Sequence, residues 1–180
     1  MSARVILISG VPGSGKTSVS RVLAKTSAAD LTVHMHTDDF YEYICKGYIS
    51  PWLDGSGDQN ETMVEAVAAG AERFCAGGYE VYVDGMIGPW FLDPWIQIAQ
   101  QGVDVRYVFL RPSEAETVSR ATTREQREYF PLNAEVVQEL WQSIADLGAY
   151  ESHAVDTTGQ SVEESAALLQ KMLREGKFRL

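Results

Sequence analysis

The chain has 180 residues, 45% of them hydrophobic, which fits one globular domain with a full core. Its net charge of −10 and its isoelectric point near 4.7 repel a phosphate backbone, so we expect no nucleic-acid partner and favour a small ligand. The residues before the first glycine-rich loop are too few for a signal-peptide core or a membrane span, so we expect a cytoplasmic protein with no membrane partner.

A glycine-rich motif follows the first predicted strand. Residues 4–9, RVILIS, form a short aliphatic run that predicts a buried strand, and residues 18–25 have the apolar spacing of a helix. Between them, GVPGSGKT at residues 10–17 matches the phosphate-binding pattern G-x-x-x-x-G-K-[ST] at every fixed position. A glycine turn without a ligand is the alternative, and the strand and helix on either side disfavour it.

The motif assigns a role to each of its conserved residue types. Its glycines allow backbone amides to curl around an oxyanion, and the start of the helix adds partial positive charge. Lys16 reaches the β- and γ-phosphates, and Thr17 offers a hydroxyl to Mg²⁺. The predicted nucleotide-binding residues of this segment are Gly10, Gly13, Ser14, Gly15, Lys16, Thr17 and Ser18.

Residues 31–37 alternate apolar and polar side chains, which predicts a second strand that ends at Asp38 and Asp39. Neighbours on a strand point to opposite sides, so only one of the two carboxylates is expected to face the phosphates. A carboxylate at this point can accept a hydroxyl proton during phosphoryl transfer. His34 and His36 share one face of the strand, and we interpret them as structural because a third metal ligand is missing.

Residues 40–60 are aromatic at first and then rich in glycine and acidic residues, and Pro51 breaks any continuous helix. We predict a short helix here, followed by a mobile substrate flap. The apolar spacing of residues 61–76 predicts a longer helix. Cys45 and Cys75 have no CxxC or Cys/His neighbours, which favours free buried thiols over a zinc site or a redox pair.

Residues 79–83 predict a third strand that ends at Asp84. The pattern resembles a Walker B strand, whose terminal aspartate holds Mg²⁺, so Asp84 and Thr17 are the predicted metal ligands. A helix cap or turn is the alternative role for Asp84. Because ligands bind at the carboxyl ends of strands in open α/β sheets, Asp84, Asp38 and the phosphate loop can converge on one cleft.

The second half of the chain continues this alternation. Helices are predicted at residues 94–101, from Asn133 to residue 144, and after Ser161, and strands at residues 103–110 and 152–156. Strands that alternate with helices throughout are typical of an α/β fold with a doubly wound parallel sheet. We therefore expect a single domain with a five-stranded parallel sheet, helices on both faces and a helical lid.

A helix that opens at Ser113 carries three arginines on one face. Ser113 and Glu116 form a capping-box pattern, and Arg120, Arg124 and Arg127 follow at helical spacing. Three guanidiniums on one face can bind phosphate oxygens together. A solvated face paired with nearby glutamates is the alternative.

Several aromatic side chains are predicted beside the cleft, namely Trp52, Trp90, Phe91 and Trp95. Packing is the more common role of such rings, and stacking on a ligand is the alternative. In an acidic chain, this many rings near a cleft suit an apolar or ring-bearing acceptor.

The GVPGSGKT loop and the segment HTDDFY resemble the P-loop small-molecule and nucleoside kinases, which include chloramphenicol phosphotransferase, gluconate kinase, nicotinamide riboside kinase and polynucleotide kinase. The resemblance spans nearly the whole chain in element order. It implies that Asp38 is the catalytic base, with Asp39 beside it, and that a lid covers residues 120–133. It also implies that adenine lies between Arg120 and the loop that contains Thr157.

The chain departs from parts of this group. Tyr41 stands where polynucleotide kinases have an arginine, and DGMIGPW at residues 84–90 replaces the D-G-F-P-R segment of adenylate kinases. Both differences disfavour a nucleotide or nucleic-acid acceptor. The guanine motif N-K-x-D is absent, which favours ATP as the donor.

These observations predict an ATP- and Mg²⁺-dependent kinase that phosphorylates a hydroxyl of a small molecule. The alternative is a nucleotide-binding module or regulatory NTPase without an acceptor, which has no need of the extra carboxylates and arginines. The predicted catalytic residues are Lys16, Asp38, Arg120 and Arg124, and the predicted substrate contacts are Asp38, Asp39 and Tyr41.

Overall fold

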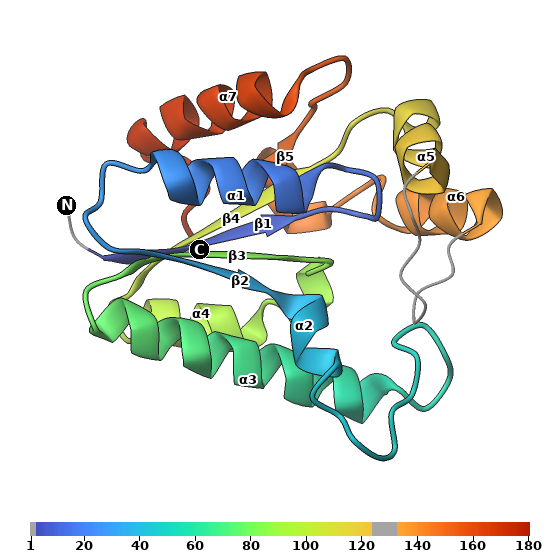
Figure 1. Ribbon diagram of the computed structural model, residues 1–180, viewed down its shortest axis with the longest axis horizontal. Helices are drawn as coiled ribbons and strands as arrows, with labels where there is room; N and C mark the ends of the chain where they lie inside the picture. Colours follow the sequence, from blue (N-terminus) through green and yellow to red (C-terminus); the bar gives the residue numbers. More distant parts are fainter. Residues whose placement is uncertain (1–2, 124–132) are drawn as a thin grey trace.

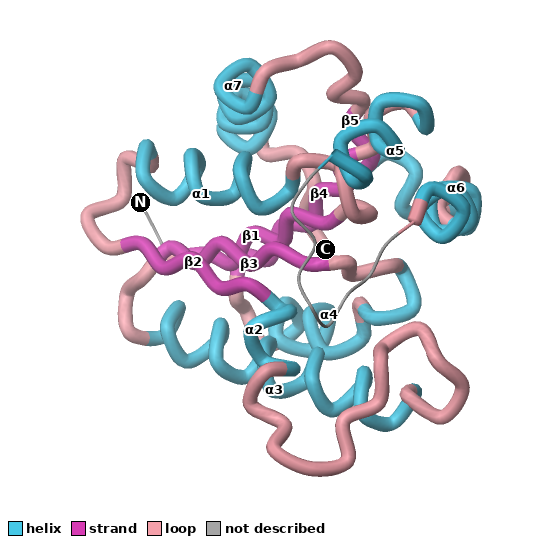
Figure 2. Tube along the Cα trace, turned by 45° about the vertical axis from the view of Figure 1, so that its right-hand side comes forward, coloured by secondary structure: helices cyan, strands magenta, loops and turns pink. Residues whose placement is uncertain are grey.

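The computed structural model describes residues 3–123 and 133–180. Within them lies a five-stranded parallel sheet of strand order β2-β3-β1-β4-β5, which confirms the predicted α/β fold. Figure 2 shows the sheet between two layers of helices. The strands are β1 (Arg4–Ser9), β2 (Thr32–His36), β3 (Glu80–Gly85), β4 (Asp104–Leu110) and β5 (Ala154–Val155).

Helices cover both faces of the sheet, with α1 and α7 on one face and α3 and α4 on the other (Figure 1). Helices α5 and α6 lie together beyond the carboxyl ends of the strands, and α2 continues β2 at the same end. No helix of the described residues is long and apolar enough to cross a bilayer. The helices are α1 (Lys16–Thr26), α2 (Thr37–Tyr41), α3 (Gly57–Ala76), α4 (Asp93–Gln100), α5 (Glu114–Thr123), α6 (Ala134–Ser143) and α7 (Val162–Arg174), with 3₁₀ turns η1 (Pro89–Phe91) and η2 (Gly148–His153).

The central strand β1 is apolar on both faces because each face supports a separate core. Val5 and Leu7 belong to the core under α3 and α4, whereas Ile6 and Ile8 belong to the core under α1 and α7. All four side chains are fully buried. Since burial of each such side chain stabilises the fold by about 1.5–3 kcal/mol, β1 holds the following glycine loop on a rigid base.

Two predicted boundaries at the carboxyl edge were wrong. Strand β2 ends at His36, so Asp38 and Asp39 lie in the first turn of α2 and not on opposite sides of a strand. Acidic side chains favour the positive end of a helix dipole, which explains the early start of α2. The last strand was predicted at residues 152–156, but it is only Ala154–Val155, because η2 occupies the residues before it.

The loop between α2 and α3 corresponds to the predicted flap. Helix α3 begins at Gly57, earlier than the predicted residue 61, and its first turn binds this loop. The Gln59 side chain exchanges two hydrogen bonds with the backbone of Ile49, at 2.6 and 2.9 Å, and Asn60 Nδ2 donates to the Pro51 carbonyl at 2.8 Å. The loop is thus anchored at its middle, and its mobility stays a prediction.

The two cysteines differ in their surroundings. Cys75 is a free, buried thiol on α3, as predicted, and burial raises its pKa. Cys45 is also free but exposed, so the prediction of burial was wrong for this residue. Its position in the loop between α2 and α3, outside both cores, explains the difference.

Candidate active site

The glycine loop turns tightly between β1 and α1. Gly15 is the N-cap of α1 with φ 87°, and Lys16 is the first helical residue. Gly13 also has a positive φ, and a Cβ at this position would lie 2.2 Å from the Thr117 carbonyl oxygen of α5. Only glycine fits such a turn. The amino end of an 11-residue helix therefore points its free amides at the loop, which makes it an anion site.

A cavity of about 430 Å³ lies over this loop and is the candidate nucleotide site. The residues that line it come from the loop, from α1, from α5, which contributes Arg120, and from the segment after β5. Gly10 is not among the described residues that line it. Gly10 packs closely against the Leu110 carbonyl instead. The predicted residues that do line it are Gly13, Ser14, Gly15, Lys16, Thr17, Ser18, Arg120 and Thr157.

Residues that the sequence did not indicate also line this cavity. Arg21 follows Thr17 by one helical turn, so the helix period could have identified it. Gln160, Ser161 and Ser165 belong to the start of α7 and its preceding turn, and only the folded chain brings them to the loop.

Two buried hydroxyls in the wall of this cavity favour a polar ligand. Ser14 Oγ and Thr157 Oγ1 are buried and have no hydrogen-bond partner among the described residues. Leaving a buried hydroxyl unpaired costs about 1–3 kcal/mol. The oxygens of a phosphate or a ribose supply the missing partners, so the cavity fits a nucleotide.

Thr17 and Asp84 meet at the base of the glycine loop. The Thr17 hydroxyl donates to Asp84 Oδ2 at 2.5 Å, and the Asp84 side chain is fully buried at the end of β3, beside β1. Hard oxygen donors of this kind suit Mg²⁺, which keeps several waters and phosphate oxygens as ligands. Among the described residues, no group of three His, Cys, Asp or Glu side chains could hold a metal ion.

Two histidines hold the Asp84 carboxylate in place. His34 Nε2 lies 2.5 Å from Oδ1, and His36 Nδ1 lies 2.9 Å from Oδ2. Although burial opposes ionisation, these contacts and the Thr17 hydroxyl hold the pKa of Asp84 far below its usual range. The structural role predicted for the histidines therefore has a specific target. The sequence could not reveal that the two histidines bind Asp84, because only the order of the strands in the folded sheet places β2 beside β3.

His36 also reaches a second carboxylate. Its Nε2 lies 3.2 Å from Asp38 Oδ2, so the ring bridges Asp38 and Asp84. Burial disfavours the charged ring, but the two carboxylates outweigh this effect and raise the pKa of His36 to about 9. Polar contacts thus run without a break from Thr17 through Asp84 and His36 to Asp38.

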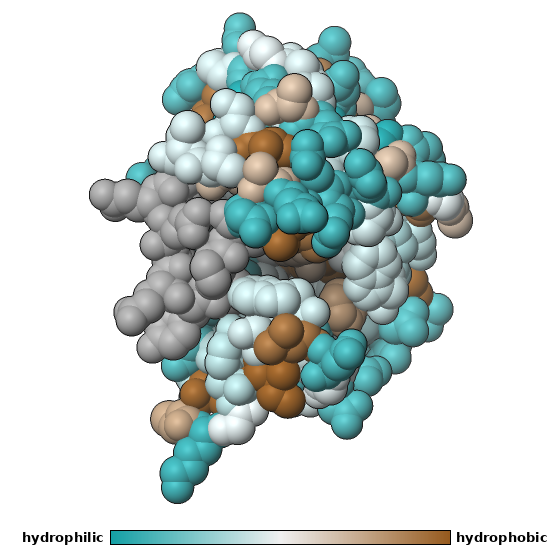
Figure 3. Space-filling model, turned by 90° about the vertical axis from the view of Figure 1, so that its right-hand side faces the viewer, coloured by the Kyte–Doolittle hydropathy of each residue, from teal (hydrophilic) through white to brown (hydrophobic). Residues whose placement is uncertain are grey.

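A second cavity, of about 390 Å³, begins at the other side of the loop. Lys16 and Thr17 line both cavities, and Asp38 and Tyr41 line only this one. Asp39 is exposed and is not among the described lining residues. Figure 3 shows the hollow on this face of the molecule, with hydrophobic residues inside it and below it.

The aromatic side chains predicted beside the cleft divide into two groups. Trp52, Trp90 and Phe91 line the second cavity, as the prediction of nearby rings requires. Trp95 is fully buried in the core under α3 and α4, so its expected place at the cleft was wrong. Its position on the inner face of α4, where Ile98 is also buried, explains the packing role.

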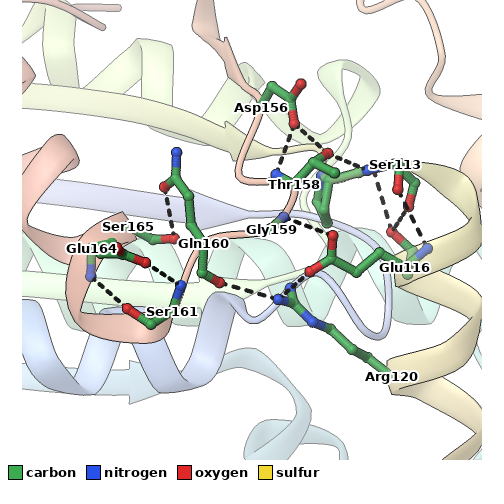
Figure 4. Close-up of polar contacts among 12 residues, drawn as sticks. Ser113, Glu116, Arg120, Asp156, Thr158, Gly159, Gln160, Ser161, Glu164 and Ser165 are labelled. Carbon is green, nitrogen blue, oxygen red and sulfur yellow. Dashed lines mark hydrogen bonds and ion pairs between the residues drawn. The ribbon is translucent and has the colours of Figure 1, made fainter.

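Helix α5 is tied to the loop after β5 by a polar network (Figure 4). The Glu116 carboxylate accepts from the Gly159 amide at 2.8 Å and pairs with Arg120, which donates to the Gln160 carbonyl at 3.2 Å. Arg120 also lines the cavity over the glycine loop, and its predicted contact with the nucleotide stays a prediction. Arg124 and Arg127 lie outside the described residues.

The capping box predicted at the start of α5 is only half formed. The Glu116 amide approaches Ser113 Oγ at 3.4 Å, but the Glu116 carboxylate binds across to the loop after β5. In its place, Thr158 Oγ1 accepts from the Ser113 amide at 2.8 Å. Contacts distant in sequence override the local motif here, whereas the box of Ser161 and Glu164 at α7 is complete, as predicted.

The sequence of most of the chain matches a known family. The sequence profile of the AAA_33 family, described as an AAA domain, matches residues 5–147. The chain belongs to this family. The chain is similar to the cytidylate kinase of Pyrobaculum arsenaticum, with 29% identity over 183 residues that cover 91% of this chain and 89% of the relative.

Solved structures of P-loop kinase-like fold superpose on this AAA_33 member along almost their whole length. A gluconokinase from Sinorhizobium meliloti 1021 has a TM-score of 0.67 at 20% identity, with 98% of each chain covered. A shikimate kinase from Acinetobacter baumannii, in complex with shikimate, has a TM-score of 0.68 at 18% identity, with 98% of this chain and 96% of that chain covered. These likenesses confirm the predicted fold.

Proposed function

We propose that this protein is an ATP- and Mg²⁺-dependent kinase that transfers the γ-phosphoryl group to a hydroxyl of a small molecule. The observation that carries the proposal is the meeting of two cavities at Lys16 and Thr17. A donor in one cavity and an acceptor in the other place the transferred group between them, which is the arrangement that phosphoryl transfer requires. A nucleotide-binding module without an acceptor has no use for the second cavity.

On the donor side, the loop amides and Lys16 bind the phosphates of ATP, and Arg120 borders the nucleotide. Thr17 and Asp84 would hold Mg²⁺, which neutralises phosphate charge when it is bound. The low pKa of Asp84 keeps its carboxylate ionised for binding Mg²⁺. By the resemblance to kinases, Arg124 would join Arg120 in a lid.

On the acceptor side, Asp38 is the proposed base. The acceptor oxygen attacks the γ-phosphorus, the bond to the leaving oxygen of ADP breaks, and the hydroxyl proton passes to the Asp38 carboxylate. His36 holds this carboxylate at 3.2 Å. Asp39, being exposed and away from the described cavity wall, is proposed only as a neighbour of the site.

The relatives support the same conclusion. The matched proteins named above are called kinases, and their names specify cytidylate, gluconate and shikimate as acceptors. We infer ATP as the donor from the absent guanine motif, and a cytoplasmic location because ATP is available there.

The proposal is tested by incubating the protein with ATP, Mg²⁺ and a pool of metabolites and antibiotics that carry hydroxyl groups. We expect ADP to form in proportion to a newly phosphorylated compound, identified by mass spectrometry. The contrary result is ADP release at the same rate with and without the pool, and no phosphorylated product. This result would support the alternative of an NTPase without an acceptor.

A further inference from the structure

We propose that the acceptor is an uncharged, largely apolar alcohol that carries a ring. This inference rests on the proposed function and assigns a chemical class to the second cavity. Its volume of about 390 Å³ lies within the usual range of small-molecule pockets. The side chains of its walls, its floor and its polar end indicate this class of ligand.

Two exposed aromatic side chains from different segments line the cavity. Trp52 comes from the loop between α2 and α3 and is 47% exposed, and Trp90 comes from η1 and is 56% exposed. Phe91 follows Trp90, with 6.2 Å between the ring centres. Large rings exposed beside a cavity gain most from a ligand with a flat apolar face, because its binding removes them from water.

The wall that carries Trp90 and Phe91 is fixed from below. The segment before η1 is held at Ile87, whose amide donates to Ser9 Oγ at 2.9 Å. The Ile87 carbonyl accepts from Ser9 Oγ and from the Tyr107 hydroxyl, both at 2.8 Å. A ring held on a rigid base binds a ligand with a smaller loss of conformational entropy.

The floor of the cavity is apolar as well. Met63, Val64 and Val67 come from one face of α3, Met86 follows β3, and Leu140 comes from α6. A floor of this kind gives no partners to the several hydroxyls of a sugar acid, each of which would lose its hydrogen bonds to water. Unbranched methionines adapt their shape to a ring or an alkyl group.

The polar side chains of the wall are engaged within the protein. The Tyr41 hydroxyl donates to Asn60 Oδ1 at 2.9 Å, and Asn60 Nδ2 donates to the Pro51 carbonyl and to Ser56 Oγ. Burial and the nearby Asp38 raise the pKa of Tyr41 to about 12, so it stays neutral. The polar end of the cavity is therefore Asp38 beside the phosphate loop, which suits one hydroxyl.

The charges around the cavity disfavour an anion. Among the described residues that line it, the cationic side chains are Lys16 and His36. Lys16 belongs to the phosphate loop, and His36 lies between the carboxylates of Asp38 and Asp84. Among the side chains described around the cavity, no further cation would face the charge of an acidic acceptor near Asp38. Gluconate, shikimate and cytidylate, which the relatives' names specify, all carry such a charge.

A matched set of probes separates ring, hydroxyl and charge. Phenylethanediol and mandelate share a benzene ring and a hydroxyl, and they differ in a hydroxymethyl group against a carboxylate. Glycerol has hydroxyls and no ring. Dissociation constants are measured by ligand-observed NMR on the protein loaded with Mg²⁺ and ADP, so that no transfer takes place.

We expect phenylethanediol to bind at least about tenfold more tightly than mandelate, because like charges repel, and more tightly than glycerol, because only the ring stacks. Trp90→Ala should weaken phenylethanediol binding about tenfold. Phe74→Ala removes another exposed ring, 42% exposed, from outside the cavity and should leave binding unchanged. Trp90→Arg adds a cation and should shift the preference toward mandelate.

Equal or tighter binding of mandelate to the wild type, or wild-type affinity in Trp90→Ala, would overturn the inference. Its failure is distinguishable from that of the kinase proposal when Mg²⁺ and ATP replace ADP. Transfer to mandelate or gluconate in preference to neutral ring alcohols overturns the acceptor class and leaves a kinase. Tight binding of phenylethanediol, with no product from it or from any compound of the hydroxyl pool, contradicts the kinase and supports only the inferred ligand chemistry of the cavity.

Discussion

At the scale of single residues, Lys16 lines both cavities, as Thr17 does, and carries a positive charge. Its ammonium group can follow the transferred phosphoryl group from donor to acceptor, which a side chain confined to one cavity cannot do. A residue in this place affects both the binding of ATP and the transfer of phosphate.

Replacing Lys16 by alanine should therefore weaken ATP binding by at least about tenfold, because a charge-assisted contact to the phosphates is lost. Calorimetric titration with Mg²⁺ and ATP measures this. Arg21→Ala, which removes another cation from the wall of the same cavity, should have a smaller effect. Unchanged ATP affinity in a folded Lys16→Ala protein would exclude the loop as the phosphate site.

His34 and His36 form a natural pair for comparison, because both bind Asp84 and only His36 also reaches Asp38. His34→Gln should mainly weaken Mg²⁺-dependent ATP binding. His36→Gln should in addition lower kcat at saturating ATP by about 10- to 100-fold, a usual cost of losing a residue that orients a ligand.

Steady-state kinetics with an acceptor that the wild type phosphorylates separate KM for ATP from kcat in these variants. His153→Gln is the control, since its ring contacts the Tyr107 carbonyl and neither carboxylate. An equal fall of kcat in the His34 and His36 variants would show that the contact with Asp38 has no separate effect.

At the scale of elements, the glycine loop is packed against α5. A Cβ at Gly13 would lie 2.2 Å from the Thr117 carbonyl, and Thr117 is itself fully buried. The loop thus depends on α5 for its shape, and α5 depends on the loop after β5 through Glu116 and Gly159.

Gly13→Ala should lower the free energy of unfolding by about 2–4 kcal/mol, because it adds a backbone clash to the strain of a positive φ. Gly102→Ala is the matched control, with φ of 98° and no atom within 4 Å of the new Cβ, and it should cost only the strain, about 1 kcal/mol. Urea denaturation measures both. Equal losses would mean that α5 yields to the added methyl group.

At the scale of the whole molecule, local patterns predicted the parts that local chemistry determines. The first strand and its glycine loop, the buried strand that carries Asp84, and the α/β alternation follow from short-range spacing, and the fold agrees with them. Pairing of Thr17 with Asp84 was also predictable, because the carboxyl ends of parallel strands share one edge.

The rest depends on strand order and packing. The hydrogen bond between His34 and Asp84 requires β2 to lie beside β3. No residue spacing along the chain predicts which strands are neighbours. The rings of Trp90 and Trp95 are alike in sequence context, yet one lines a cavity and the other fills a core. The short edge strand β5 has too few residues to show a pattern.

In the proposed reaction, a phosphoryl group passes from ATP to a hydroxyl activated by Asp38, where the two cavities meet. Single-turnover transfer from γ-labelled ATP to an identified acceptor tests it in the wild type, in Asp38→Asn and in the exposed-neighbour control Asp39→Asn. We predict that Asp38→Asn binds ATP normally and transfers about 10²- to 10⁴-fold more slowly, with Asp39→Asn near wild type. Full transfer by Asp38→Asn, or a comparable loss only in Asp39→Asn, would contradict the account.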